Sequence, residues 1–288
     1  MSLPADLPVD SHVHTQWSWD APGGDMVATC ERAVAIGLPA LAFTEHVDIT
    51  PTVVPDEVVA ALAVDAPDHP VVVLTREGQL TPPPFDVDGY LASVAECRDR
   101  FPQLRILTGL ELGEPHRHGP MLDDLLARAS FDRVLGSLHC LPMRDGFGEP
   151  PALYVEQDPA MVVRDYLAEI VELVRADTRF EVLAHVDFPA RWWPESSGPF
   201  DIGDFEEEFR AALKATAVSG RALELNTRLP HAEPLLRWWR DAGGAAVSFG
   251  SDAHEPTKLA AGFREAAHLA EAHGYRPGRH PHELWGSS

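Results

Sequence analysis

The clearest alternation of strand and helix lies in residues 221–250, which read RALELNTRLPHAEPLLRWWRDAGGAAVSFG. Residues 221–226 and 245–250 are short, mainly apolar runs typical of buried strands, and residues 232–242 between them carry apolar side chains at helical spacing. Gly243 follows the helical run, at a position where glycine commonly ends a helix. This stretch predicts a strand, a helix and a second strand of an α/β protein.

The same alternation extends over nearly the whole chain. Strands are also predicted at residues 7–13, 40–44, 105–111, 133–138 and 180–185. Helices are also predicted at residues 26–36, 90–100, 122–129, 159–176, 202–219 and 263–272, with Gly37 and Gly220 in C-cap positions. Seven such units fit either a (β/α)7 barrel or a doubly wound sheet, and both architectures gather functional groups where the strands end.

The composition predicts a protein with a large core and no general affinity for polyanions. Of the 288 residues, 45% are hydrophobic and 24% are charged, which is enough apolar material to bury a core without disulfides. Lys and Arg number 23 against 45 Asp and Glu, and the net charge of −22 argues against nucleic-acid or anionic-membrane partners. Neither a signal peptide nor a membrane helix is expected, because no apolar run reaches roughly 18 residues.

The cysteines point to a reducing compartment. Cys30, Cys97 and Cys140 lie far apart and match neither a zinc motif nor an even disulfide framework, so we expect a cytoplasmic protein. Cys140 is expected to be a buried small residue and not a nucleophile.

Two segments interrupt the alternation. Residues 51–88 are rich in Pro and acidic residues, and we expect an insertion that packs on the mouth of a single domain spanning residues 1–288. Residues 143–158 are expected to form a loop, either a lid or a solvated connection. Residues 276–288 are expected at the surface.

Potential metal ligands gather at the predicted strand ends. His12 and His14 stand two residues apart at the end of the first strand, where a period of two puts both imidazoles on one face. Six of the seven strands end in His, Asp or Glu. The strand ends other than that of His12 and His14 read Thr44-Glu45-His46, Gly109-Leu110-Glu111, Gly136-Ser137-Leu138-His139, Ala184-His185-Val186-Asp187 and Gly250-Ser251-Asp252-Ala253-His254. Each alone could be a helix cap, a surface charge or a core histidine, but together they predict a metal site.

In these motifs, together with Glu224-Leu225-Asn226-Thr227, the sequence resembles the polymerase-and-histidinol-phosphatase (PHP) metallophosphoesterases, and among them the histidinol-phosphatase branch. The resemblance spans His12 to His254. It implies a distorted seven-stranded (β/α)7 barrel with two to three divalent ions at its C-terminal mouth.

Carried over position by position, the resemblance implies three metal positions. The first would be held by His12, His14, Glu111 and Asp252, the second by Glu111, His139 and His185, and the third by Asp20, His46 and His254. Asp25 is a nearby rival to Asp20. A carboxylate at Asp20 favours Mn or Fe relative to Zn, although availability in the cell also matters.

Glu111, Asp252 and His254 are the candidate catalytic residues. Clustered divalent ions activate water and clamp the oxygens of an in-line displacement at phosphorus. The leaving group needs a proton from a general acid. The candidates for this acid are solvent, a metal-bound water, His116 and His118.

The ligand cluster and the resemblance together imply a metal-dependent phosphatase that acts on a small phosphomonoester, with L-histidinol phosphate as the favoured substrate. Arg191, Arg228 and Arg144 are candidates for phosphate binding, because a guanidinium suits bidentate contact with phosphate. Trp192-Trp193 could stack on an aromatic ligand or pack internally, whereas Trp238-Trp239 are expected in the core. The alternatives are a PHP phosphoesterase that acts on a nucleotide or another phosphodiester, and a metal-binding PHP module without catalysis. The oligomeric state is open.

Overall fold

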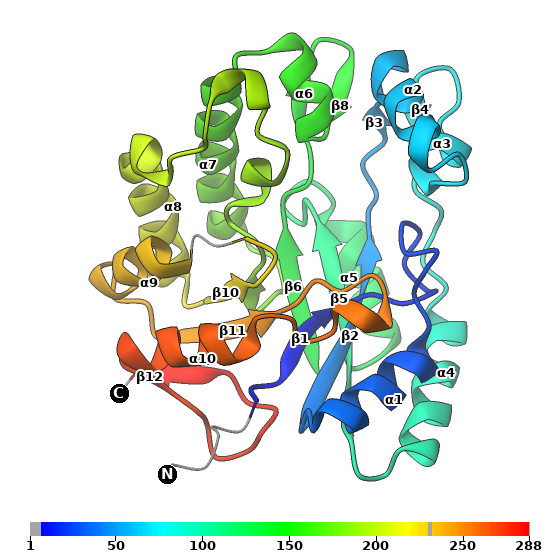
Figure 1. The fold of residues 1–288 in the computed structure, drawn as a ribbon, viewed down its shortest axis with the longest axis vertical. Helices are drawn as coiled ribbons and strands as arrows, with labels where there is room; N and C mark the ends of the chain where they lie inside the picture. Colours follow the sequence, from blue (N-terminus) through cyan, green and yellow to red (C-terminus); the bar gives the residue numbers. More distant parts are fainter. Residues whose placement is uncertain (1–6, 230–231, 288) are drawn as a thin grey trace.

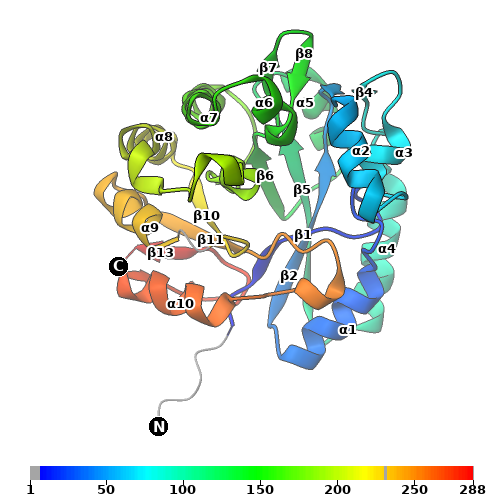
Figure 2. The ribbon, with the colours of Figure 1, turned by 45° about the horizontal axis from the view of Figure 1, so that its top comes forward.

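The computed structural model describes residues 7–229 and 232–287. Its centre is one curled sheet with strand order β1-β2-β5-β6-β9-β10-β11-β13-β12, and helices surround this sheet on its outer side (Figures 1 and 2). The strands are Asp10–Val13 (β1), Ala40–Val47 (β2), Arg105–Gly113 (β5), Arg133–Ser137 (β6), Val182–Leu183 (β9), Ala222–Asn226 (β10), Ala246–Gly250 (β11), Tyr275–Arg276 (β12) and Trp285–Ser287 (β13). The predicted α/β class is confirmed.

The sheet is parallel from β1 to β11, and each of these strands overlaps one of the runs predicted from the sequence. Within the described residues the sheet nevertheless has nine strands and not seven, because β13 pairs antiparallel with β11 and β12 pairs antiparallel with β13. The expectation of a surface tail is wrong for Trp285, which is 4% exposed and packs against Phe249 with ring centroids 4.9 Å apart. Strands of two or three residues are too short to show a period in the sequence.

The first and last parallel strands are joined by hydrogen bonds between the end of β1 and the segment that follows β11. Asp252 N–H donates to the carbonyl of His12 over 2.8 Å, and His14 N–H donates to the carbonyl of Ala253 over 2.9 Å. Nearer its start, β11 instead pairs with β13. The curl is therefore drawn together at the edge where the strands end, which brings β1 and the segment after β11 side by side.

The helices follow the predicted runs to within about one turn. They are Met26–Ile36 (α1), Val87–Arg100 (α4), Gly119–Arg128 (α5), Pro159–Arg175 (α7), Glu206–Ser219 (α8), Ala232–Asp241 (α9) and Phe263–Ala272 (α10), and a 3₁₀ turn at Ile202–Phe205 precedes α8. Gly37, Gly220 and Gly243 have φ of 73°, 78° and 83°, the left-handed conformation that glycine adopts at low cost. The C-cap predictions are confirmed for Gly37 and Gly220, and Gly243 is the second residue after the end of α9.

The core lies between the sheet and these helices. Its larger part joins β6, β9, β10 and β11 to α7, α8, α9 and α10, and a second part joins β1 and β2 to α1 and α4. Trp238 and Trp239 of α9 are 1% and 0% exposed, so the expectation that they are core residues is confirmed. Smaller apolar clusters of sheet residues, such as Ala42 with Leu107 and Val182 with Ala222, complete the core. Nearer the strand ends the buried residues include His12, Glu111 and His185.

The two irregular segments contain short elements. Residues 51–88 form Thr52–Val53 (β3), Asp56–Asp65 (α2), Pro70–Leu74 (α3) and Gln79–Leu80 (β4), with β3 and β4 antiparallel. Residues 143–158, expected to be a loop, contain part of the hairpin Leu141–Met143 (β7) and Gly146–Gly148 (β8), followed by the helix Pro150–Glu156 (α6). Pro150 begins that helix, since proline is tolerated in a first turn, where no backbone N–H is needed. In addition to Ile202–Phe205, the structure has 3₁₀ turns at Phe188–Trp192, Glu195–Ser197 and Pro256–Lys258.

Across the described residues, no helix combines the length and the apolar character needed to cross a bilayer. Cys30, Cys97 and Cys140 are all buried and free. Burial raises the pKa of the Cys140 thiol, in agreement with its expected role as a small core residue.

Candidate metal centre

Glu111, near the end of β5, is the centre of a cluster of imidazoles. Its side chain is fully buried. Glu111 Oε2 lies 2.9 Å from His12 Nε2, 3.3 Å from His14 Nε2 and 3.2 Å from His46 Nδ1. Its other oxygen, Oε1, lies 2.8 Å from His185 Nε2 and 3.2 Å from His139 Nε2. Five histidines thus surround one carboxylate, and they come from β1, the residue after β1, β2 and the segments after β6 and β9.

Asp252 closes this cluster from the segment after β11. Its Oδ1 lies 3.4 Å from His14 Nε2, 3.8 Å from His12 Nε2 and 3.6 Å from His254 Nδ1. Asp252 has φ of 51°, in the left-handed region that is costly for a residue other than glycine. Backbone strain of this kind is often held at functional sites, and here the bond of Asp252 N–H to the carbonyl of His12 fixes it.

Asp20 joins the cluster and Asp25 does not. Asp20 Oδ2 lies 3.3 Å from His46 Nε2 and 3.1 Å from His254 Nε2. Asp25 instead caps α1, where its side chain accepts from Ala28 N–H over 2.8 Å. The structure therefore brings together all nine residues expected as metal ligands: His12, His14, Asp20, His46, Glu111, His139, His185, Asp252 and His254.

The charges of the cluster shift the pKa values of its members strongly. Burial opposes ionisation of Glu111, but the imidazoles of His12, His46 and His139 outweigh it and hold the Glu111 pKa well below its usual range. Burial also opposes protonation of His46, yet Asp20, Glu111 and Asp48 raise its pKa to about 10. The carboxylates thus outweigh burial and raise the pKa of His12, His46 and His139, whereas burial lowers the pKa of His14 and lowers that of His185 to about 4.

Several atoms of the cluster are poised for a cation. His14 Nε2, His46 Nδ1 and Asp20 Oδ1 are buried and have no hydrogen-bond partner among the described residues. Buried polar atoms without partners are rare and costly, and a coordinated ion would satisfy these. Ligand atoms within 4.8 Å of one another occur in the groups His12, His14 and Glu111; Glu111, His139 and His185; His12, His185 and Asp252; His14, His46 and His254; and His46, Asp48 and His139. The imidazole and carboxylate donors suit divalent metal binding.

The three candidate phosphate-binding arginines are placed differently. Arg191 Nη1 lies 2.7 Å from Asp252 Oδ2, and the Arg191 Nε and Nη2 are buried without a partner in the described part of the chain. Arg228 Nη1 lies 3.7 Å from the same oxygen, and its side chain is 48% exposed. Arg144 is exposed in the turn between β7 and β8, and the structure does not bring it to the cluster. Among the three, only Arg191 offers buried, unused donors.

The structure adds two carboxylates that the sequence analysis did not single out as site residues. Asp48 Oδ1 accepts from His139 Nδ1–H over 3.0 Å, and Glu224 Oε1 accepts from His12 Nδ1–H over 2.6 Å. Asp48 follows His46 by two residues, the same spacing as His12 and His14, so a period of two at the end of β2 could have revealed it.

The other candidates lie outside the cluster. His116 Nε2 lies 2.8 Å from Glu169 Oε1, and His118 Nε2 lies 2.7 Å from Thr50 Oγ1. Trp193 packs edge-on against Phe205 with ring centroids 6.1 Å apart. Trp192 is 38% exposed.

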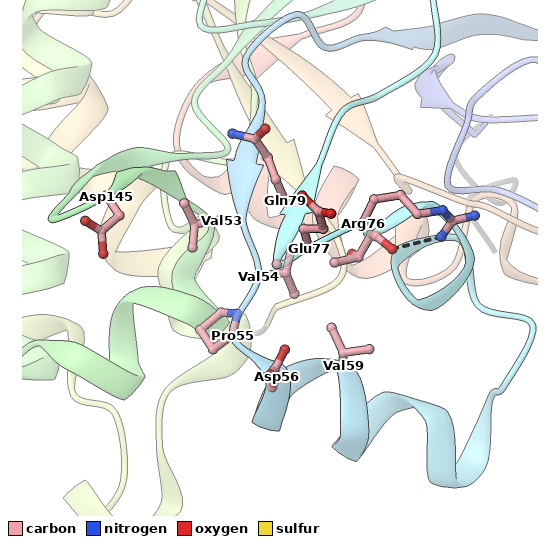
Figure 3. A pocket seen from close by; sticks show the side chains of 11 residues that line it. Val53, Val54, Pro55, Asp56, Val59, Arg76, Glu77, Gln79 and Asp145 are labelled. Atoms are coloured by element: carbon pink, nitrogen blue, oxygen red, sulfur yellow. Dashed lines mark hydrogen bonds between the residues drawn. The ribbon is translucent and has the colours of Figure 1, made fainter.

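A separate cavity of about 790 Å³ lies between β3, the start of α2 and the turn between β7 and β8 (Figure 3). Val53, Val54 and Pro55 form part of its wall, and Asp145 of the β7–β8 turn also lines it. As far as the described residues show, none of the expected metal or phosphate ligands lines it. The segment 51–88 therefore forms a hollow of its own, apart from the metal cluster.

Comparison with known proteins gives a family match and two relatives that match over most of their length. The PHP domain family model matches residues 10–228. A probable histidinol-phosphatase of Clostridium acetobutylicum is 23% identical over 278 residues, which cover 93% of this chain and 94% of that protein. A histidinol-phosphatase of Lactococcus lactis subsp. lactis is 24% identical over 257 residues, which cover 85% of this chain and 84% of that protein.

A solved structure has the same fold. It is the crystal structure of histidinol phosphate phosphatase from Lactococcus lactis subsp. lactis, complexed with zinc, L-histidinol and phosphate. The TM-score is 0.76 at 21% sequence identity, and the match covers 96% of this chain and 98% of that chain.

Proposed function

This chain belongs to the PHP domain family, and from that premise we propose that it is a metal-dependent phosphatase that hydrolyses L-histidinol phosphate to L-histidinol and phosphate. The observation that carries the proposal is the set of five histidines around Glu111, next to the two unused donors of Arg191. The choice of substrate is supported by the relatives named histidinol-phosphatase and by the ligands of the Lactococcus lactis structure.

The proposed cofactors are two to three divalent ions, which would be Mn, Fe or Zn. His12, His14, Glu111 and Asp252 would hold the first, and Glu111, His139 and His185 the second. Asp20, His46 and His254 would hold the third. Bound there, such ions would supply activation of water near neutral pH and compensation of the phosphate charge. The barrel of the proposed enzyme would consist of the seven parallel strands, and its mouth would be the edge where β1 meets the segment after β11.

The chain's own residues would position the substrate. Arg191 would donate from Nε and Nη2 to two phosphate oxygens, because a planar guanidinium fits that geometry. Arg228 would contact the phosphate from the exposed rim, and Arg144 would approach only from the β7–β8 turn. Glu111, Asp252 and His254 are the proposed catalytic residues, since all three border the space in which water and phosphate would meet.

We extend the proposal to the whole chain. Residues 1–288 would form one PHP-type domain with an insertion at 51–88, acting in histidine biosynthesis. The free state of all three cysteines supports a reducing cytoplasm as its compartment.

The proposal is tested by elemental analysis of protein purified without added metal, together with phosphate release from L-histidinol phosphate and a panel of other monoesters and diesters. We expect two to three metal ions per chain and preferential turnover of L-histidinol phosphate. Asp252→Asn and His139→Ala should each abolish turnover while the protein stays folded by circular dichroism. Full activity in both variants would refute the mechanism. Turnover of diesters alone would show that the substrate is a phosphodiester and not L-histidinol phosphate.

A further inference from the structure

Two of the cluster histidines are each bound by a carboxylate on the side away from Glu111. His139 points Nε2 toward Glu111 Oε1, 3.2 Å away, and donates from Nδ1 to Asp48 Oδ1 over 3.0 Å. His12 points Nε2 toward Glu111 Oε2, 2.9 Å away, and donates from Nδ1 to Glu224 Oε1 over 2.6 Å. Each imidazole therefore has one nitrogen directed into the cluster and the other committed to a second carboxylate.

Both outer carboxylates are themselves held in place. Asp48 Oδ2 accepts from Trp19 Nε1–H over 2.8 Å. Glu224 Oε2 accepts from the backbone N–H of His185 over 2.8 Å and from Asn226 Nδ2–H over 3.2 Å. In each case one oxygen is anchored by a donor of the fold and the other faces the histidine. A carboxylate that is anchored in this way fixes the ring plane of its partner.

A glycine of the neighbouring strand makes room for each pair. A Cβ atom at Gly113, the last residue of β5, would overlap Asp48 Oδ1 and lie 3.5 Å from His139 Nδ1. A Cβ atom at Gly250, the last residue of β11, would overlap Glu224 Oε1 and lie 2.8 Å from His12 Cβ. Neither glycine has positive φ, so space is what requires glycine here. The same arrangement of glycine, carboxylate and histidine thus occurs twice.

We propose that Asp48 and Glu224 are positioning residues that fix the tautomer and orientation of His139 and His12, and that Gly113 and Gly250 provide the space that they need. A neutral imidazole that donates from Nδ1 has its lone pair on Nε2, and this is the form that binds a cation. This inference rests on the proposed metal-dependent function. The proposal makes Asp48 a hydrogen-bond acceptor for His139 and not a metal ligand. Asp48 Oδ2 also lies 3.5 Å from His46 Nδ1.

The test measures metal affinity and needs no substrate. The full-length protein is stripped of metal with a chelator and titrated with Co²⁺ in the presence of a competing chelator, and the visible absorption of bound Co²⁺ is followed. Asp48→Asn and Glu224→Gln keep the side-chain volume and remove the charge. Both should weaken Co²⁺ binding roughly 10- to 100-fold, which is typical for such partners, with the wild-type number of ions at saturation.

Gly113→Ala should weaken binding in the same direction, because the added methyl group displaces Asp48. Gly119→Ala is the matched control, since a Cβ atom there has no neighbour within 4 Å, and it should bind as wild type does. Thermal unfolding of the metal-free variants checks the fold. The isosteric Asp48→Asn and Glu224→Gln variants decide the question by themselves if Gly113→Ala does not fold.

The outcomes separate this inference from the proposed function. Wild-type affinity in both Asp48→Asn and Glu224→Gln would overturn the positioning role. Loss of one whole ion from Asp48→Asn at saturating Co²⁺ would also overturn it, because Asp48 would then be a ligand. A wild-type protein that binds no Co²⁺ would instead contradict the proposed function itself.

Discussion

Replacing Arg191 by methionine is expected to lower kcat/KM for L-histidinol phosphate by two to four orders of magnitude. Arg191 is 8% exposed, and one of its nitrogens is already paired with Asp252 at 2.7 Å. The other two, Nε and Nη2, have no partner among the described residues. A hydrogen bond to a charged group is worth about 1.5–3 kcal/mol. Two such bonds to phosphate give about 3–6 kcal/mol, or roughly 10²–10⁴ in kcat/KM at about 1.4 kcal/mol per decade.

Arg228→Met is the matched control for this prediction. Arg228 is 48% exposed and its Nη1 lies 3.7 Å from the same carboxylate oxygen. Because solvent screens exposed ion pairs, its loss should cost less than about tenfold in kcat/KM. The loss of kcat/KM in Arg191→Lys should lie between those of Arg191→Met and Arg228→Met, because an ammonium group keeps the charge but lacks the paired donors of a guanidinium.

The assay is phosphate release over a range of substrate concentrations, with elemental analysis of each variant. Arg191→Met should retain its metal, because none of the proposed ligand atoms belongs to it. Activity within threefold of wild type at full metal content would refute the reasoning. So would equal losses in Arg191→Met and Arg228→Met. Loss of activity in parallel with loss of metal would mean that Arg191 acts through Asp252 and not on phosphate.

Two further predictions concern stability. Trp285→Ala should lower the free energy of unfolding by about 3–5 kcal/mol, because it empties the buried site against Phe249. Denaturant unfolding measures this loss, with Trp192→Ala as the control because Trp192 is partly exposed. A loss no larger than that of Trp192→Ala would show that β13 adds little to the core. Hydrogen bonds from His116 and Arg117 lower the pKa of Glu169 from 4.5 to about 2. Because the pKa is lower in the folded state, ionised Glu169 contributes to the free energy of unfolding above pH 4.5, and this contribution is lost as the pH falls toward 2. Glu169→Gln should therefore flatten the acid side of the stability curve in that window, and an unchanged pH dependence would contradict the role of this pair.

Much of the site could be predicted from local sequence patterns. His12 and His14 share a face because strand side chains alternate, and parallel strands bring Glu111, His139 and His185 to the same edge. The choice between Asp20 and Asp25 could not be made in this way, because both follow β1 in an irregular segment. Packing separates them, since Asp25 caps α1 while Asp20 turns toward His46 and His254.

The features that escaped prediction depend on contacts between distant residues. A period of two could place Asp48 on the same face as His46, but not its bond with His139. That bond joins the residue after β2 to the segment after β6, and a single sequence carries no record of that distance. The strands β12 and β13 are too short for a period, and Trp285 of β13 is buried against Phe249 of β11, which is distant in the sequence. Arg191 and Arg228 look alike in the sequence, and only their burial distinguishes them.

The central claim is that hydrolysis of L-histidinol phosphate depends on metal ions held by the Glu111 cluster. The most direct measurement is phosphate release by the chelator-stripped protein before and after addition of Mn²⁺, Fe²⁺ or Zn²⁺. The account predicts that the stripped protein is inactive and that at least one of these ions restores turnover. Undiminished turnover of L-histidinol phosphate by protein shown to be metal-free would contradict it.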